Sequence, residues 1–306
     1  MLKNNSTKIK FSAEDKVFYA FVYTYIALLL IIVLYPLIFV ISSSFSEQMA
    51  VRTGKVILWP CDENGHLAFS LNGYKAIFEK NDVLIGYRNT IIYTVLGTML
   101  NLILTFIAAY PLSRKDLAGR RVIMFIFTFT MIFSGGMIPS YLLMRNLGLV
   151  NNPLIMIIGS AISVYNLIIA RTFIENSIPI DLLEAAKIDG CSDFKYFIKM
   201  VLPLSKSVIA VLTLYYALTH WNAYFGAFMY LNDRNYWPLQ LFLREILVEN
   251  QVDANYTDYE LQEAKAGLAD LLKYALIIVS TVPVMILYPF IQKHFVTGVM
   301  IGSVKG

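Results

Sequence analysis

Six long stretches of this sequence contain no charged residue, and they constrain the fold more than any other feature. The uncharged runs cover residues 17–46, 89–113, 122–144, 146–170, 207–232 and 274–292. Each is close to or above the roughly 20 residues that an α-helix needs to cross about 30 Å of hydrocarbon. The composition agrees, because 58% of the 306 residues are apolar and only 15% are charged. The sequence therefore predicts an all-α, polytopic membrane protein with six transmembrane helices.

The spans are expected at about 17–44, 87–113, 122–144, 150–172, 206–230 and 272–292, within a single transmembrane domain of residues 1–306. The apolar stretch of the first run, from Val17 to Ile41, exceeds the roughly 7 to 15 residues of the apolar region of a cleaved signal peptide. We therefore expect the first run to remain in the protein as a membrane span.

The connections between these runs differ in their content of Lys and Arg. The N-terminal segment, residues 114–121, residues 171–206 and the C-terminal tail hold most of them. Positively charged connections prefer the cytoplasmic side of a membrane. We therefore expect both termini to be cytoplasmic, together with the connection at about 177–205, which agrees with an even number of spans.

The chemistry that usually drives transport is missing from the six runs. They contain no Asp or Glu, and His220 is their one candidate for a proton relay of the kind that proton-coupled carriers use. The sequence lacks the motifs HExxH, GxSxG and GxxxxGK[ST] and has no Cys/His cluster at metal-ligand spacing. This pattern indicates no catalytic residue and no metal site, so uphill transport would need energy from another polypeptide. The alternatives are a secondary carrier for a small polar solute and a scaffold or intramembrane enzyme.

A charged segment, EAAKIDGCSDFKYFIKMVLP, separates the fourth and fifth runs and covers Glu184 to Pro203. Just before it, Pro179 and Asp181 suit the first turn of a short helix, and Gly190 can adopt the left-handed conformation that ends one. Ser192 is placed to cap a second helix. The apolar residues of that helix follow i, i+3, i+4, i+7 spacing: Phe194, Phe197, Ile198 and Val201. We expect two short helices joined at a glycine elbow.

The same segment matches a known motif. Glu184-Ala185-Ala186, Gly190 and Leu202-Pro203 resemble the cytoplasmic coupling loop of ABC importer permeases, with Met200 where that family usually has Ile. Further segments carry the resemblance: AAYPLSR (108–114), SGGMIPSYLL (134–143), HWNAYF (220–225), WPLQLFLREIL (237–247) and the terminal VKG (304–306). From about residue 18 to its end, the chain resembles permeases of the maltose-type carbohydrate-uptake family. The SGGMIPSYLL and WPLQLFLREIL segments are most similar to a branch associated with oligosaccharide and polysaccharide-fragment uptake in Gram-positive bacteria.

The resemblance implies a non-catalytic subunit that forms half of a translocation pathway for a carbohydrate, expected to be an oligosaccharide, in a bacterial plasma membrane. In that family a permease pairs with a homologous second permease and with two cytoplasmic ATPase subunits, while an extracellular lipoprotein delivers the sugar. The chain itself would bind no cofactor, because ATP and Mg belong to the ATPase, and it would bind no nucleic acid.

The resemblance also implies roles for named residues. The residues expected to couple to the ATPase are Glu184, Ala185, Ala186, Gly190, Leu202 and Pro203. The tail residues Lys305 and Gly306 would reach between the ATPase subunits. Simpler interpretations stay open, namely a solvated helix charge for Glu184 and a frayed terminus for the tail.

Polar and aromatic residues near the middle of the fifth run are candidates for the substrate pathway: Tyr216, His220, Trp221, Asn222 and Tyr224. Tyr216, His220 and Tyr224 recur at i, i+4, i+8, which would place them on one stripe of a helix. Aromatic faces beside hydrogen-bonding groups suit a pyranose, and helix–helix hydrogen bonding is the alternative. Asn101 and Asn166 are further mid-run polar residues, for which helix packing is the default.

Overall fold

The computed structural model describes residues 12–79, 81–252, 272–286 and 288–289. Helices make up most of this part of the chain, and its only β-type pairing is an isolated bridge between Cys61 and Leu67. The predicted all-α class is confirmed for these residues. The contacts group into two compact units, Met1–Ile77 with Ala254–Ile278 and Phe78–Asp253 with Val279–Gly306, and the single transmembrane domain stays a prediction.

The first unit is dominated by α1, Ala13–Ser44, a helix of 32 residues. It begins at a capping box, in which the Ser12 hydroxyl accepts the Asp15 amide and the Asp15 carboxylate accepts the Ser12 amide. Most of its apolar side chains are exposed on the protein, as expected where lipid is the solvent. Two short helices follow, α2 at Gln48–Arg52 and α3 at Asn72–Phe78.

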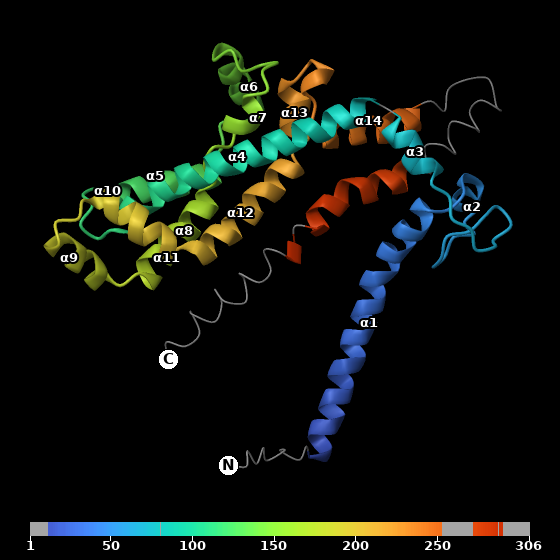
Figure 1. Cartoon of the computed structure of the whole chain (residues 1–306), viewed down its shortest axis with the longest axis horizontal. Coiled ribbons are helices and arrows are strands. Elements are labelled where there is room, and N and C mark those ends of the chain that lie inside the picture. The colour runs from blue at the N-terminus through green and yellow to red at the C-terminus, as the bar shows by residue number, and fades with distance from the viewer. Residues whose placement is uncertain (1–11, 80, 253–271, 287, 290–306) are drawn as a thin grey trace. The chain divides into compact units, whose positions relative to one another are not determined.

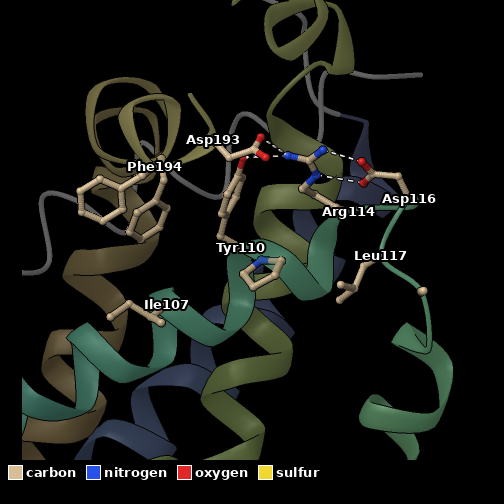
Figure 2. A pocket seen from close by; sticks show the side chains of 10 residues that line it. Ile107, Tyr110, Arg114, Asp116, Leu117, Asp193 and Phe194 are labelled. Atoms are coloured by element: carbon tan, nitrogen blue, oxygen red, sulfur yellow. Dashed lines mark hydrogen bonds and ion pairs between the residues drawn. The ribbon is translucent and has the colours of Figure 1, made fainter. Parts of the chain in front are cut away.

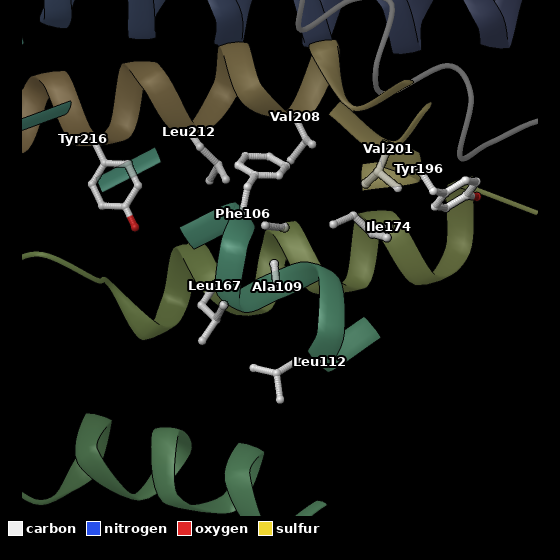
Figure 3. Packing of buried hydrophobic residues seen from close by; sticks show 11 residues of the cluster. Phe106, Ala109, Leu112, Leu167, Ile174, Tyr196, Val201, Val208, Leu212 and Tyr216 are labelled. Atoms are coloured by element: carbon white, nitrogen blue, oxygen red, sulfur yellow. The ribbon is translucent and has the colours of Figure 1, made fainter. Parts of the chain in front are cut away.

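The second unit is organised around α4, Asn81–Ser113, a helix of 33 residues. Two helices pack along it (Figure 1), α8 at Val164–Ser177 and α12 at Lys206–Trp221. The buried residues between them form the core cluster drawn in Figure 3: Phe106, Ala109, Leu112, Leu167, Ala170, Ile174, Tyr196, Val201, Val208, Leu212 and Tyr216. Small residues such as Ala109 and Ala170 allow close approach of helices, which is the main route to tight packing in lipid.

Breaks divide three of the predicted spans. The run at 122–144 forms α5, Arg120–Ile132, and α6, Met137–Asn146, with Gly136 at φ 91° between them. The run at 150–172 forms α7, Ile155–Ile158, before α8. The run at 206–230 forms α12 and then α13, Phe225–Tyr230. An apolar run therefore does not ensure one continuous helix.

Helix length and composition support a multi-pass membrane protein. α1 and α4 are long and apolar enough to cross a membrane by themselves. Two bent pairs would cross as broken spans, α5 with α6 at 113° and Asp193–Leu204 with α12 at 79°. A shorter apolar helix covers Leu272–Ile286. The described residues supply two to four spans by these criteria, and the count of six stays a prediction.

Figure 1 shows one group of further elements at the left end of the second unit. This group comprises α9, Ile180–Ile188, α10, Asp193–Tyr196, the π-helical turn η1, Phe197–Val201, and α11, Leu202–Leu204. The other group comprises α13, the 3-10 turn η2, Arg234–Tyr236, and α14, Leu239–Val252, of which α14 packs against α4. Gly86 lets α14 approach α4 closely, since a Cβ there would lie 2.9 Å from the Leu239 Cα.

Candidate functional site

The charged segment forms the predicted elbow. α9 ends in a Schellman motif, in which the Gly190 amide donates to the Lys187 carbonyl and the Cys191 amide donates to the Ala186 carbonyl. Gly190 has φ 70°, which is the left-handed conformation that the sequence predicts. The Ser192 hydroxyl then accepts the Lys195 amide at 3.3 Å and caps α10. Backbone hydrogen bonds and one cap therefore fix the angle between the two arms.

The two faces of α9 have different environments. Leu182, Leu183 and Ala186 pack against the core cluster. Glu184 and Ala185 point outward and are exposed, and Ile188, next to the elbow, is 86% exposed. Within the described part of the chain, Glu184 forms no ion pair. The structure thus leaves a free carboxylate and an exposed apolar side chain on the outer face of α9.

The second arm departs from the predicted periodicity. Phe194 and Ile198 are 73% and 45% exposed, so they are not buried with Val201, although the i, i+3, i+4, i+7 spacing groups them with it. The reason is the π-helical turn η1, which changes the register, so that Tyr196 and Val201, five residues apart, are the buried pair. Leu202 packs against the core cluster, and Pro203 is exposed just before the bend into α12.

An arginine clasp fastens this arm to the end of α4. Arg114 donates hydrogen bonds to the carboxylates of Asp116 and Asp193 and to the Tyr110 hydroxyl, as Figure 2 shows. The guanidinium of Arg114 lowers the pKa of Asp116 to about 2. Both carboxylates are more than half exposed, so each pair contributes only about 0–1 kcal/mol. The clasp therefore directs α10 more than it stabilises the fold.

A second group of polar residues lies between α4, α8 and α12. His220 Nε2 lies 2.6 Å from Asn101 Oδ1, and Asn101 Nδ2 donates to the carbonyls of Ser160 and Ala161 at 2.6 and 2.8 Å. These carbonyls belong to the break between α7 and α8. Irregular backbone at membrane depth is tolerated where it is buried or lines a water-filled cavity. Asn101 supplies hydrogen bonds to the two carbonyls of this break, and its contact with His220 holds the Asn101 side chain in place.

Tyr216 supports the same break from the next turn of α12. Its hydroxyl lies 2.7 Å from the Thr105 hydroxyl and accepts the Ser163 amide at 3.2 Å. Tyr216 and His220 are both buried, which agrees with the helix-packing interpretation of these side chains. The i, i+4 spacing predicted that Tyr216 and His220 lie on one side of a helix, and both are on the buried side of α12.

Asn101, Tyr216 and His220 line one wall of a cavity of about 710 Å³, here called the polar pocket. Its other polar and aromatic lining residues are Ser160, Ser163, Tyr165, Asn166, Tyr215 and Thr219. Tyr165 and Tyr215 are 57% and 37% exposed, so their rings are open to a ligand. Sequence analysis missed Tyr165, Tyr215 and Thr219, because only folding brings α8 and α12 side by side.

The other three predicted pathway residues lie elsewhere. Trp221 is buried and donates Nε1–H to the Ser280 carbonyl at 2.9 Å. The Asn222 amide donates back to the Leu218 carbonyl. The prediction that Tyr224 continues the helical stripe is wrong, because α12 ends at Trp221. Lys305 and Gly306, the predicted tail contacts, lie outside the described residues.

Comparisons with known proteins agree on one family. Residues 101–301 match the family described as "Binding-protein-dependent transport system inner membrane component". The chain is 41% identical to the polygalacturonan/rhamnogalacturonan transport system permease protein YtcP of Bacillus subtilis (strain 168), over 96% of this chain and 100% of the relative. It is 38% identical to protein LplC of the same organism, over 90% of both chains.

A solved structure shows the same fold. It is the crystal structure of a bacterial ABC transporter involved in the import of the acidic polysaccharide alginate, with a TM-score of 0.82 and 34% identity. The match covers 94% of this chain and 100% of the other. These matches support an ATP-driven importer and not the secondary carrier that the sequence analysis left open as an alternative. The chain therefore belongs to the binding-protein-dependent transport system inner membrane components, and it is a non-catalytic transmembrane permease subunit of an ABC importer for a carbohydrate.

Proposed function

We propose that this chain forms half of a translocation pathway and transmits the movement of cytoplasmic ATPases to it through the α9–α10 elbow. The partners are a homologous second permease, two ATPase subunits that bind ATP and Mg, and an extracellular sugar-binding lipoprotein. Six spans cross the plasma membrane of a bacterium, with both termini on the cytoplasmic side. Family membership supports this assembly in outline, and the Lys and Arg content of the connections supports the orientation.

The elbow carries the coupling proposal. Its inner face is packed on the core cluster, its angle is fixed by the Schellman motif and its second arm is held by Arg114. A rigid body of this kind can move a membrane helix when a partner pushes it. The exposed Glu184 carboxylate and the exposed Ile188 side chain suit a groove that offers a cation and an apolar wall. We assign Glu184, Ala185, Ala186 and Gly190 to this contact, with Leu202-Pro203 at the bend into α12.

A charge-removal experiment tests the coupling role. Glu184→Gln should leave the importer assembled and lower the stimulation of ATP hydrolysis by the sugar-loaded binding protein. Loss of one partner from a buried charge pair costs about 2–5 kcal/mol, so stimulation should fall at least tenfold. Glu14→Gln, which removes an exposed carboxylate at the start of α1, is the matched control. Equal stimulation in the two variants, measured in proteoliposomes, would exclude a coupling role for Glu184.

We further propose that the sugar is an acidic oligosaccharide, built from uronic acid units. The importer with the same fold acts on an acidic polysaccharide, and the permease with 41% identity is named for polygalacturonan and rhamnogalacturonan. No Lys or Arg lines the polar pocket. This chain would therefore contact hydroxyl groups and ring faces, while the carboxylates are recognised by the partner permease or the binding protein.

Uptake assays in cells that lack this chain test the substrate class. Supplying the chain should restore uptake of radiolabelled galacturonate oligomers and not of neutral maltodextrins of equal length. Restored uptake of the neutral oligomers alone would overturn the acidic assignment and leave the permease assignment intact.

A further inference from the structure

A basic pocket lies between the end of α4, the start of α5 and the end of α8, near the α9–α10 elbow. Its volume is about 810 Å³, and four of its lining residues are basic: Lys115, Arg120, Arg121 and Arg171. Glu175 is the single acidic residue of the lining. The pocket thus has more positive charge than its own carboxylate can neutralise.

The hydrogen bonds show where this excess charge lies. Glu175 accepts one hydrogen bond from Arg120 at 2.8 Å and one from Arg171 at 2.9 Å, so two cations share one carboxylate. Arg171 also donates Nε–H to the Leu112 carbonyl, which fixes its side chain. Within the described residues, Lys115 and Arg121 form no ion pair, and both are exposed. Two partly buried arginines and two exposed cations therefore face one cavity, and Lys115 acts on Glu175 only through longer-range attraction.

The first turn of α5 adds to the positive potential. Gly119 is its N-cap residue, and no side chain caps this end. The amide groups and the helix dipole at such an end favour an anion. The helix end adds to the positive potential of the pocket, while the four basic side chains supply most of it.

An apolar stripe leads away from the pocket along α5. Phe125 and Phe129 follow Arg121 at i+4 and i+8, and their rings stack at 6.4 Å. Phe133 continues the stack at 5.2 Å from Phe129. All three rings are at least 49% exposed. A cationic mouth joined to an exposed apolar stripe matches the two parts of a phospholipid, a phosphate and an acyl chain.

We propose that this basic pocket binds the phosphate of an anionic phospholipid, with its acyl chains along the Phe125–Phe129 stripe. Basic pockets at the membrane boundary are known binding places for anionic head groups. A carboxylate from an ATPase would satisfy the cations but not the apolar stripe, and inorganic phosphate would leave the stripe uncovered. The lipid accounts for both features and would hold the ends of α4, α5 and α8 together beside the elbow.

The test titrates the intact importer, purified in neutral detergent, with phosphatidylglycerol or phosphatidylcholine and follows bound lipid by native mass spectrometry. Phosphatidylglycerol should bind more tightly than phosphatidylcholine. Arg121→Gln and Lys115→Gln should each weaken its binding about fivefold, equivalent to about 1 kcal/mol per basic residue. Arg121→Lys keeps the charge and should retain most of the affinity. Lys206→Gln, which removes an exposed cation at the start of α12 outside this pocket, should have no effect.

Three outcomes would overturn the proposal. The first is unchanged phosphatidylglycerol binding in Arg121→Gln and Lys115→Gln. The second is that inorganic phosphate displaces bound lipid as effectively as added phosphatidylglycerol does, which would indicate a site for free phosphate. The third is loss of the ATPase from Arg121→Gln with lipid binding intact, which would assign this surface to the ATPase.

Discussion

Among single residues, Gly97 on α4 has the tightest steric requirement near the polar pocket. A Cβ at this position would lie 2.4 Å from Cε1 and Nε2 of His220. The ring would have to move away from Asn101, with which it forms a 2.6 Å hydrogen bond. An overpacked core costs about 1–3 kcal/mol, and a buried polar group left without a partner costs a similar amount. Gly97 therefore fixes the ring that supports the break before α8.

The first prediction concerns this contact. Gly97→Ala should lower the thermal unfolding midpoint of the purified importer, because it costs about 2–4 kcal/mol by the two effects combined. Adding His220→Ala should cost less than the sum of the two single changes, since the clash is then gone. Gly226→Ala is the control, because a Cβ there meets no atom within 4 Å. Equal midpoints for Gly97→Ala and Gly226→Ala would contradict the prediction.

The sequence predicts the structural role of a residue where that role depends on residues close by in the sequence. Gly190 and Ser192 are examples, because a helix stop and a cap each involve residues within five positions. The Arg114–Asp193 pair joins residues 79 positions apart, so neither residue could be singled out as a clasp. Tyr165 and Tyr215 were missed for the same reason.

At the scale of elements, the elbow offers a second prediction. Gly190 has φ 70° and open space around it, so a larger residue is strained only through its backbone. A non-glycine residue in this conformation costs about 1–2 kcal/mol, most for β-branched residues and least for Asn. Gly190→Val should therefore change the elbow angle and lower the stimulation of ATP hydrolysis by loaded binding protein, while Gly190→Asn should retain most of it.

The comparison of the two variants separates two causes. If both variants lose stimulation equally, bulk at the partner contact is responsible and strain in the elbow is not. ATP hydrolysis in proteoliposomes, with and without loaded binding protein, gives the measurement.

The sequence predicted that these segments are helical, but it did not predict where the helices are interrupted. Charge-free runs identify apolar segments, since burial in lipid forbids unpaired charges. They do not reveal breaks, which depend on local conformation such as φ 91° at Gly136 or on remote partners such as Asn101. The π-helical turn at Phe197–Val201 likewise leaves no signal in the spacing of apolar residues, and it separates the exposed Phe194 from the buried Val201.

At the scale of the whole molecule, the family could be predicted because its motifs are contiguous in the sequence. The EAA segment and the SGGMIPSYLL segment can be recognised without knowledge of the fold. The polar pocket could not be predicted, because its wall combines side chains from α4, α8 and α12. The chain is a permease subunit of an ABC importer and its six uncharged runs contain no carboxylate, so we propose that ATP hydrolysis by a partner drives transport through the elbow. We propose that the polar pocket is the part of this chain that meets the sugar.

The last prediction places the sugar on Tyr215, whose ring is 37% exposed at the polar pocket. Tyr215→Ala should lower uptake about tenfold, equivalent to about 1.4 kcal/mol for a lost stacking contact. Tyr215→Phe keeps the ring and should retain uptake, and Tyr224→Ala, outside the pocket, should change it little. Hydrolysis of ATP without substrate should persist in all three, which separates a pathway role from poor assembly. Equal uptake by Tyr215→Ala and Tyr215→Phe would assign the sugar contacts to the partner permease.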